Sequence, residues 1–388
     1  MRPRFFHAFY CNRTRLVHTN ARNAFLSPVR TALQSRPTGL YLQQGPGVTP
    51  EQDGSGDPST QRKWIKGMRN SAFCNRGTAS HGRAYSLSGL RDSDLLVQAM
   101  QAQRIFGNIR KVSPRDRSFG DRLLGRRSAG IAIHIERAFP AWFSAAQRHI
   151  LIPNQERFPH RHLGRLKKID LVLCKSQFAT AIFQKLGIRT EYLGFTSEDR
   201  SVPAVEKDWA GVFHLAGGST LKGTEDLLAL WTRHPEWPVL HLVQKKALAP
   251  KSVAPNVDLI TRYLPDSELR TMQNRYGIHL CPSRGEGWGH HIVEGMSAGA
   301  LVLTVDAPPM NEHLDASTGL LVPYSRTQPR HLGTCYFADL AALEAQIVLV
   351  FAMNTGEKAR FGRAARLAFE RIDREFRERL TRIFGALP

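Results

Sequence analysis

The sequence predicts an α/β protein with two parallel-sheet domains that face each other across a cleft. From residue 84 onward, short apolar runs of strand length alternate with amphipathic segments of helical period. A polar linker at residues 196–208 divides this alternation into two halves. Such alternation is typical of parallel strands joined by helical crossovers, whose ligands bind beyond the carboxyl ends of the strands. We therefore expect a shortened N-terminal domain over 84–200 and a C-terminal domain over 201–388.

The first 83 residues differ from the rest of the chain. They are rich in Arg, Ser, Thr, Asn, Gly and Pro, show weak periodicity, and contain no acidic residue before Glu51. A segment of this composition buries too little apolar surface to fold alone, so we expect a disordered extension. An organelle transit peptide and upstream sequence outside the functional protein are the two other interpretations. No function is assigned to residues 1–83.

The charge of the chain narrows the range of partners. Its 54 Lys and Arg residues exceed its 33 Asp and Glu residues, which gives a net charge of +21. A basic surface attracts nucleic acids, anionic lipid headgroups and phosphate-bearing ligands alike. The excess is concentrated in residues 1–80 and 104–127, and the sequence contains no aromatic RNA-binding motif. We therefore expect a phosphate-bearing ligand, with contact to an anionic membrane as a further option, and no specific nucleic acid.

Cysteine and hydropathy patterns indicate a cytoplasmic protein. The sequence has no C-x-x-C pair, so a structural zinc site is not expected. Cys174 and Cys281 each end an apolar run, as expected of small buried thiols. No window holds the roughly 20 apolar residues that a membrane-spanning helix needs. We therefore expect a cytoplasmic location, peripheral to the membrane at most.

The N-terminal half is predicted to alternate strands with helices. Asp92 and Asp94 lie where acidic residues favour the start of a helix, and Gly187 stands where glycine ends one. Short apolar runs bounded by turn residues predict the strands. The strands are expected at 129–136, 149–153, 170–174 and 190–193, and the helices at 90–100, 142–148 and 177–186.

The C-terminal half repeats this alternation and ends in a helical tail. Residues 339–384 combine helical apolar spacing with many charge pairs four residues apart, which predicts a solvated pair of surface helices. Before this tail, strands are expected at 211–216, 239–243, 257–260, 278–282, 301–305 and 320–323, and helices at 224–233, 266–276 and 290–298.

The most informative stretch follows an apolar run and reads PSRGEGWGHHIVEGM over residues 282–296. Its glycines let the backbone approach a ligand and present N–H groups to it. The free N–H groups at the start of the next helix suit phosphate or sugar oxygens. Glu286 in the loop and Glu294 on the helix can point into the same cleft and serve different tasks there. A plain strand–loop–helix turn with solvated acids is the alternative.

A second glycine-rich turn lies at the first strand-to-helix junction of the C-terminal half, over residues 214–224. A lysine and hydroxyl groups before a helix can cradle a diphosphate, and Lys222 would neutralise its charge. The turn lacks the G-x-x-x-x-G-K-[ST] pattern of a P-loop, and a surface lysine is the alternative. Two more turns follow strands, at 263–269 and 303–312. The first is expected to be structural, although its loop could contact a nucleotide base.

These pieces, in this order, resemble the C-terminal half of the retaining GT-B glycosyltransferases known as family 4, or group 1. That family has a G-R-x-x-x-x-K-G turn, then P-S-x-x-E-G-F-G-x-x-x-x-E-A-M with its E-x7-E pair, then T-D-x-G-G-x-x-E. Here the second piece reads PSRGEGWGHHIVEGM and the third TVDAPPMNE. The resemblance covers residues 205–345 and, more weakly, 84–200. It implies two Rossmann-like domains and transfer of a sugar from a nucleotide-sugar donor to an acceptor, with retained anomeric configuration.

The resemblance implies a role for each matching residue. Lys222 would bind the donor diphosphate, Glu286 would hold the donor sugar, and Glu294 would accept hydrogen bonds from the ribose. Glu286 and Lys222 are the catalytic candidates. The other donor-binding candidates are Gly217, Gly218, Ser219, Thr220, Gly287, Trp288, Gly289, His290 and Asp306.

The chain departs from the family pattern at two places. Gly217 stands where the family places an arginine, which removes one cation from the diphosphate site. Pro308 and Pro309 replace the glycines of the third motif, which removes backbone N–H donors near the sugar. An altered donor, compensation by Ser219 or Arg284, and lost activity are the three interpretations.

Polar residues at the strand ends of the N-terminal half are candidates for acceptor binding. His134 and Glu136 end one strand, and the sequence Asn-Gln-Glu at 154–156 ends the next. Ser88 and Gly89 correspond by position to the first glycine-rich loop of the family. A solvated strand end is the alternative for each. The acceptor-side candidates are Ser88, Gly89, His134, Glu136 and Gln155; the acceptor itself, a saccharide, a lipid-linked compound or a small molecule, is not identified.

No metal ion or other cofactor is expected. The histidines show no H-E-x-x-H spacing, and no D-x-D motif stands out. Two alternatives to an enzyme remain open: a catalytically inactive GT-B scaffold that binds a ligand or partner, and a basic nucleic-acid or membrane-surface protein with this fold. The enzyme interpretation requires the side chains of Lys222, Glu286 and Glu294 to converge on one crevice.

Overall fold

The computed structural model describes residues 83–87, 90–113 and 116–387, which belong to one compact unit. Apart from its last residue, the basic segment 1–83 lies outside the described residues. Ser88 and Gly89 lie outside them as well. What the sequence predicts for these residues stays a prediction.

The first half of the described chain forms a six-stranded sheet in which every pair of neighbours is parallel. The strand order is β2-β1-β3-β4-β5-β6. The chain thus adds β2 on one side of β1 and then crosses to the other side, where β3 to β6 follow in order. The strands are β1 (Arg83–Leu87), β2 (Asn108–Val112), β3 (Ala129–Glu136), β4 (Ala146–Pro153), β5 (Leu171–Cys174) and β6 (Thr190–Tyr192). The helices are α2 (Leu90–Ala102), α3 (Phe119–Leu123) and α4 (Gln177–Lys185).

The second half forms another six-stranded parallel sheet, of order β12-β11-β10-β7-β8-β9. This is the doubly wound order of nucleotide-binding α/β proteins, with the reversal between β7 and β10. The strands are β7 (Asp208–Gly217), β8 (Leu240–Gln244), β9 (Val257–Ile260), β10 (Tyr276–Cys281), β11 (Leu301–Val305) and β12 (Leu320–Val322). The helices between them are α5 (Thr224–Arg233), α6 (Asp266–Arg275) and α7 (His290–Ser297). The predicted α/β class with two Rossmann-like sheets is confirmed.

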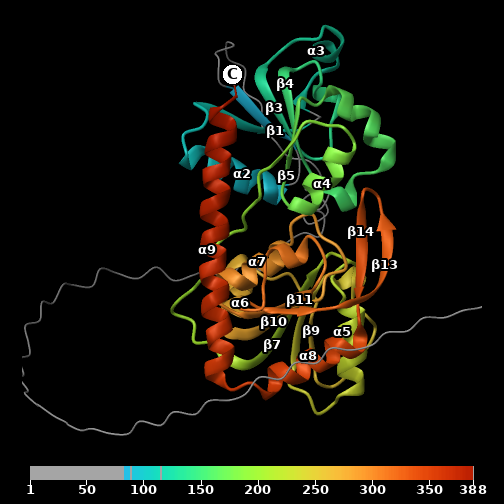
Figure 1. Cartoon of the computed structure of the whole chain (residues 1–388), viewed down its shortest axis with the longest axis vertical. Coiled ribbons are helices and arrows are strands. Elements are labelled where there is room, and N and C mark those ends of the chain that lie inside the picture. The colour runs from blue at the N-terminus through green and yellow to red at the C-terminus, as the bar shows by residue number, and fades with distance from the viewer. Residues whose placement is uncertain (1–82, 88–89, 114–115, 388) are drawn as a thin grey trace, which may run out of the picture. The chain divides into compact units, whose positions relative to one another are not determined.

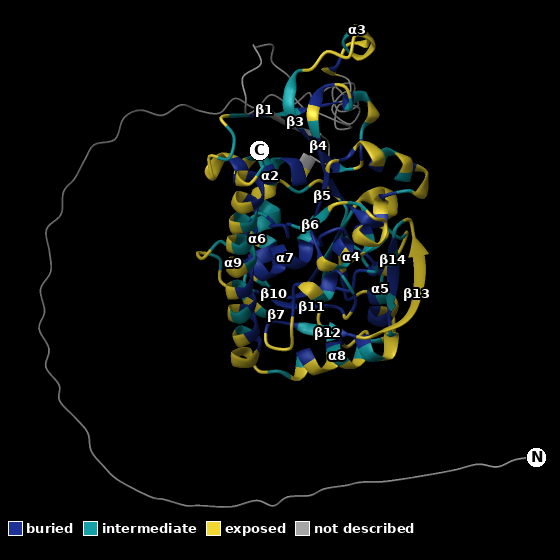
Figure 2. Ribbon diagram, turned by 45° about the horizontal axis from the view of Figure 1, so that its top comes forward, coloured by how far each residue is buried: buried dark blue, intermediate teal, exposed yellow. Residues whose placement is uncertain are grey.

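The strands are buried because both faces of each sheet are covered by helices. All five residues of β11 and all four of β5 are buried, as expected of apolar strands in a parallel sheet. Helix α7 is buried between the strands β10 and β11 and the helix α9 (Thr355–Gly385), and Figure 2 shows it in the colour of buried residues. This placement brings the start of α7 to the carboxyl end of the sheet.

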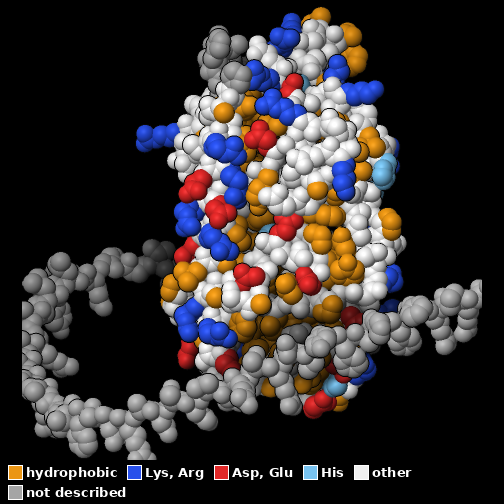
Figure 3. Space-filling view, in the orientation of Figure 1, with side chains coloured by type: hydrophobic (Ala, Val, Ile, Leu, Met, Phe, Trp, Pro, Cys, Tyr) orange, Lys and Arg blue, Asp and Glu red, His pale blue; other side chains and the backbone are white. Residues whose placement is uncertain are grey.

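Helices α8 (Leu340–Ala352) and α9 form the predicted helical tail, but the prediction that this tail is solvated is wrong for one face. Figure 1 shows α9 running beside both sheets. Phe376 packs on Phe195 with ring centroids 5.2 Å apart, and Phe384 packs on Phe106 at 5.6 Å. The outer face carries interspersed acidic and basic side chains, visible along the α9 edge in Figure 3. The regular charge pairs of the sequence therefore concealed an apolar face that holds both halves together.

Several regions differ from the predicted elements. Strands β1 and β2 and the short helix α3 were not predicted. The helix expected at 142–148 is absent: Pro140–Trp142 is a single 3-10 turn, and residues 146–148 begin β4. The sequence did not predict the antiparallel hairpin of β13 (Tyr324–Arg330) and β14 (Gly333–Ala338), whose outer strand is exposed along its whole length. No helix within the described ranges is both long and apolar enough to cross a membrane.

Candidate functional site

Loops at the carboxyl ends of the two sheets line one cleft with a volume of about 420 Å³. In the C-terminal sheet these loops follow β7 and β10, the two strands between which the order reverses. The crevice outside such a reversal is where doubly wound sheets bind their ligands. The opposite wall comes from the start of α2 and from the ends of β3, β4 and β5. The two predicted walls therefore meet in one cleft.

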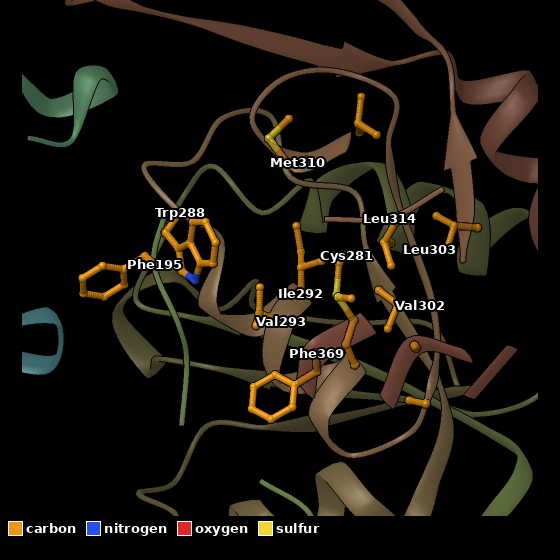
Figure 4. Packing of buried hydrophobic residues seen from close by; sticks show 14 of the residues in the cluster. Phe195, Cys281, Trp288, Ile292, Val293, Val302, Leu303, Met310, Leu314 and Phe369 are labelled. Atoms are coloured by element: carbon orange, nitrogen blue, oxygen red, sulfur yellow. The ribbon is translucent and has the colours of Figure 1, made fainter. Parts of the chain in front are cut away.

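The loop after β10 is held in place by the ring of Trp288, which is 5% exposed. The ring centroid lies 6.2 Å from that of Phe195 and 4.3 Å from that of His313, both edge-on, and Figure 4 shows the first contact. The indole N–H donates to Ser197 Oγ at 3.2 Å. Because its ring is used for anchoring, Trp288 fixes the loop rather than offering an aromatic face to a ligand.

The turn before α5 depends on Gly223. Its φ of 69° is left-handed, and a Cβ at this position would lie 2.2 Å from the carbonyl oxygen of Pro282. Any side chain here would push the turn after β7 away from the loop after β10. The close approach brings Lys222, the preceding residue, next to that loop.

Lys222 lies at the centre of the C-terminal wall. Its Nζ donates to Glu286 Oε1 at 2.6 Å and to His291 Nδ1 at 3.0 Å. Burial and the charge of Lys222 hold the pKa of His291 well below its ordinary value, so this ring is neutral. Because Nδ1 accepts from the ammonium, Nε2 carries the proton and donates to Ser283 Oγ at 3.0 Å. These contacts fix the ammonium in the cleft beside the Glu286 carboxylate.

Glu294 lies one and a half turns into α7 and is 1% exposed. Its Oε2 accepts a hydrogen bond of 3.1 Å from Gln273 Nε2, and its carboxylate pairs with the guanidinium of Arg91. Arg91 belongs to α2, so this ion pair crosses the cleft from one half of the chain to the other. The cleft is therefore lined by two ion pairs, Lys222 with Glu286 and Arg91 with Glu294.

A chain of buried polar groups joins α2, β5 and α7. Asp92 accepts from Lys175 Nζ and, at 2.7 Å, from His290 Nε2. Lys175 also donates to Asn154 Oδ1 at 2.8 Å, and His290 Nδ1 meets Ser197 Oγ at 2.8 Å. Burial opposes ionisation of Asp92, but Lys175 and His290 outweigh it and hold the pKa of the carboxyl well below its usual range. The charged form of Asp92 thus ties the two walls together.

Two acidic side chains lie on the N-terminal wall. Glu136 ends β3 with a φ of 65°, a left-handed conformation that is uncommon outside glycine and often marks functional sites. Glu156 is 4% exposed, and its Oε2 has no hydrogen-bond partner among the described residues. Burial and the nearby charge of Glu286 raise the pKa of Glu156 to about 7. This wall therefore carries a carboxyl group that titrates near neutral pH.

The structure brings most of the predicted donor-site residues together. Thr220 is exposed and does not line the cleft. Asp306 lies outside it as well and accepts a hydrogen bond from Asn311. The predicted residues that line the cleft are Gly217, Gly218, Ser219, Lys222, Glu286, Gly287, Trp288, Gly289, His290 and Glu294.

The structure places each of the three described acceptor-side candidates in different surroundings. Glu136 lines the cleft. Gln155 lies behind the lining and donates from Nε2 to the backbone oxygen of Glu286 at 2.8 Å. His134 is buried in the core, where its Nε2 is 3.0 Å from His149 Nδ1, and burial lowers its pKa to about 3. It is fully buried and does not line the cleft, so the structure does not support an acceptor role.

The suggested compensation for the missing arginine also changes. Arg284 pairs with Glu225 and Asp226 at the start of α5 and lies over the ring of Phe337. It does not line the cleft, whereas Arg91 does. Two cations are therefore candidates to replace the missing arginine: Arg91, which lines the cleft from the N-terminal half, and Lys245, whose Nζ would lie 3.1 Å from a Cβ at Gly218.

Several residues of the N-terminal wall were not predicted from the sequence. Arg91 and Asp92 follow the position of the family's first glycine-rich loop, and Lys175 follows a strand just as Glu156 does. Their position at strand ends could have suggested them. Burial and pairing, which distinguish them from solvated residues, are visible only in the structure.

Within the described part of the chain, no group of three or more His, Cys, Asp or Glu side chains is placed to hold a metal ion. Cys174 and Cys281 are buried and free, as predicted. Burial raises the pKa of both thiols to about 12, so they are unreactive at neutral pH.

No family model matches the chain, and no curated protein matches it in sequence. Solved structures match its fold. A glycosyltransferase from Rickettsia africae shares 12% identity at a TM-score of 0.58, over 79% of this chain and 98% of the other. Sucrose-phosphate synthase from Thermosynechococcus elongatus shares 13% at 0.57, over 79% and 98%. The pneumococcal O-GlcNAc transferase GtfA, solved with UDP and GlcNAc, shares 13% at 0.51, and the match covers 66% of this chain and 56% of GtfA.

These similarities establish the fold. The chain has the GT-B architecture of two Rossmann-like sheets with a cleft at their carboxyl ends. At identities of 12 and 13%, they leave the activity, the donor and the acceptor to be argued from the site itself.

Proposed function

We propose that the protein transfers a sugar from a nucleotide-sugar donor to an acceptor with retained anomeric configuration, in the manner of group 1 glycosyltransferases with an E-x7-E pair. One observation carries this proposal: Lys222, Glu286 and Glu294 line a single cleft of a GT-B fold. Lys222 and Glu286 are 64 residues apart in sequence and 2.6 Å apart between Nζ and Oε1. An ammonium in this arrangement suits the diphosphate in the middle of a nucleotide sugar, and two carboxylates suit the hydroxyl groups of its sugar and its ribose.

The three residues have different tasks in this proposal. Lys222 offsets charge on the departing diphosphate, which is the largest charge that develops in the reaction. Glu286 accepts hydrogen bonds from hydroxyls of the donor sugar, and Glu294 accepts them from the ribose. The first N–H groups of α7 lie at the cleft without a side-chain cap, so they can donate to phosphate or sugar oxygens.

Arg91 supplies the second cation of the diphosphate site in this proposal. The family's arginine is replaced by Gly217, and Arg91 enters the same cleft from α2. Release of Arg91 from Glu294 would free this carboxylate for the ribose hydroxyls. Because a Cβ at Gly217 would have no atom within 4 Å, Gly217→Arg can be accommodated, although its φ of 55° is strained. We expect Gly217→Arg to restore donor affinity to an Arg91→Ala variant.

Donor binding tests the proposal directly. Thermal unfolding is measured with UDP-, GDP- and ADP-sugars, starting with UDP-sugars because UDP is bound in the structure of the similar GtfA. A donor at 100 times its Kd should stabilise the protein by about 2.7 kcal/mol. Lys222→Ala should reduce this shift, whereas Lys251→Ala, which removes an exposed lysine outside the cleft, should leave it unchanged. Nuclear magnetic resonance of the transfer product would then report the anomeric configuration.

An inactive scaffold is the second candidate, and the loss of the family's arginine at Gly217 favours it. Such a scaffold would be stabilised by a nucleotide or a nucleotide sugar and would release no nucleoside diphosphate from any donor. Turnover of a single donor by the wild type, lost in Lys222→Ala, excludes this candidate.

Three properties stay predictions. Activity is expected to persist in EDTA, because no metal ion is assigned to the reaction. A cytoplasmic location and contact with anionic membranes are checked by cell fractionation and by cosedimentation with phosphatidylserine vesicles. Binding to polynucleotide is expected to be weak and without sequence preference.

A further inference from the structure

Glu156 is a buried acid that the donor-binding roles above do not use. It lines the cleft, is 4% exposed, and has an Oε2 without a hydrogen-bond partner within the described residues. Leaving a buried polar atom unpaired costs stability, so such an atom in a ligand cleft indicates a group of the ligand as its partner.

The surrounding backbone clamps Glu156 between the donor loop and the β13–β14 hairpin. The neighbouring side chain of Gln155 donates to the backbone oxygen of Glu286 at 2.8 Å. From the hairpin tip, Leu332 N donates to the Gln155 backbone oxygen at 3.2 Å. A Cβ at Gly333 would lie 3.2 Å from the backbone of Glu156. Figure 1 shows this hairpin projecting from the C-terminal sheet towards the N-terminal half. Glu156 is thus held next to the segment that would carry the donor sugar.

The charged groups around Glu156 come from several elements and act in opposite directions. Glu286, from the loop after β10, disfavours its ionisation, and burial does so more strongly. Arg157, with Nε 3.6 Å from Glu156 Oε1, and Lys175, at the end of β5, favour it. Cys335 faces it from β14 as a neutral thiol, since burial raises the pKa of that group. The balance puts the pKa of Glu156 at about 7, so the carboxyl can gain or lose a proton at neutral pH.

We propose that Glu156 binds the acceptor hydroxyl group and takes its proton during sugar transfer. This inference rests on the proposed function, since it assigns the acceptor side of the same cleft. Glu156 and Glu136 both line the N-terminal wall, where their carboxyl groups can accept hydrogen bonds from hydroxyls. Asp92, Arg91, Arg157 and Lys175 line the same wall, so neither sign of charge dominates it. The acceptor class is therefore a sugar or another polyol.

The step balances with these groups alone. On one and the same face of the donor sugar, the bond from the anomeric carbon to the diphosphate oxygen breaks and the acceptor oxygen forms its bond to that carbon, so the anomeric configuration is retained. The electron pair of the broken bond leaves with the diphosphate, next to Lys222. The proton of the acceptor hydroxyl passes to the Glu156 carboxylate and returns to solvent after the product leaves.

Water serves as the acceptor probe, because a base that activates a hydroxyl group in this cleft also activates water. The experiment measures release of nucleoside diphosphate from the donor found by thermal shift, between pH 5.5 and 8.5. The wild type, Glu156→Gln and Glu156→Asp are compared. Glu191→Gln is the matched control, since this acid lies on β6 of the same sheet beside Arg382 and outside the cleft. Donor affinity is measured separately for every variant.

The expected result is a rate that rises through about pH 7 in the wild type and in Glu191→Gln. Glu156→Gln should be slower at pH 8 by about 100-fold or more, as general bases contribute about 10² to 10⁴. It should have no pH dependence over this range and an unchanged donor affinity. Glu156→Asp should recover part of the rate together with its pH dependence.

Three results overturn the inference. The first is a Glu156→Gln variant with the wild-type rate and pH profile. The second is a wild type whose rate of nucleoside diphosphate release does not change between pH 5.5 and 8.5; in both cases the donor site stands and the role of Glu156 fails. The third is loss of cooperative unfolding in both Glu156 variants, which assigns the residue a purely structural role. A wild type that binds donor and releases no nucleoside diphosphate refutes the transfer reaction, and this inference with it. Absence of donor binding by the wild type refutes the proposed function itself, and this inference with it.

Discussion

Replacing Glu156 by Gln should make the protein more stable above neutral pH, by an amount that follows from the burial of this carboxyl. The pKa of Glu156 is raised from 4.5 to about 7, first by burial and then by the charge of Glu286. At about 1.4 kcal/mol per pKa unit, this difference corresponds to about 3 kcal/mol. Because the side chain is only 4% exposed, solvent screens this effect little. Gln keeps the size of the protonated carboxyl and cannot ionise.

The direction of this change with pH follows from the form of the Glu156 carboxyl that the folded protein favours, which is the protonated one. The folded pKa lies above the unfolded one, so the stability linked to the protonated carboxyl is fully present below pH 4.5. It is lost progressively as the pH rises to about 7 and stays lost above that. Glu156→Gln does not lose this stability, because its amide cannot ionise. The free energy of unfolding of Glu156→Gln, relative to the wild type, should therefore increase by about 3 kcal/mol between pH 4.5 and pH 8.

Urea unfolding followed by tryptophan fluorescence at both pH values measures this difference. Glu191→Gln is again the control, and its difference from the wild type should change by less than about 1 kcal/mol. If the difference in free energy of unfolding between Glu156→Gln and the wild type also changes by less than about 1 kcal/mol between the two pH values, then Glu156 ionises as freely in the folded protein as in water. The assignment of a carboxyl that titrates near pH 7 would then be wrong.

Three further predictions concern donor binding, the turn before α5 and the apolar face of α9. Lys222→Ala should lower kcat by about 10² to 10³, which is the usual cost of removing one hydrogen-bond donor to a developing oxyanion. Steady-state kinetics with the donor found by thermal shift measures this change. Gly223→Ala should destabilise the protein by more than about 2 kcal/mol, because the new Cβ would clash with the Pro282 oxygen and the left-handed backbone would be strained. Gly125→Ala is the control: its backbone is also left-handed, but a Cβ there would have open space around it. It should cost only the strain of about 1–2 kcal/mol, as measured by urea unfolding. Phe376→Ala should cost about 3–5 kcal/mol in the same assay, and a cost below 1 kcal/mol would show that α9 is not packed as described.

The order and type of most elements followed from local patterns in the sequence. Helix α5 and strands β3, β9 and β11 have the predicted bounds, since alternation of apolar runs with helical period depends only on nearby residues. The failures have the same origin. Residues 142–148 contain a helical pattern too short to outweigh a proline turn and the pairing of β4 with β3 and β5.

The donor wall could be predicted for a physical reason. Lys222, Glu286 and Glu294 each follow a strand of a parallel sheet, and the carboxyl ends of such strands meet at one edge. A local motif that places each residue just beyond a strand therefore also places them near one another. Their convergence depended on β7 and β10 being neighbours in the sheet, which the structure shows.

The arrangement of the N-terminal wall depended on the tertiary structure. Asp92 and Lys175 are 83 residues apart, and Gln155 and the Glu286 backbone 131, so no local pattern connects them. The raised pKa of Glu156 requires burial against a hairpin and a loop from the other half of the chain. Periodicity along the chain thus determined the strands, the helices and the donor motif. Long-range packing alone decided which polar groups lost contact with water, because desolvation and charge pairing are set by neighbours in space.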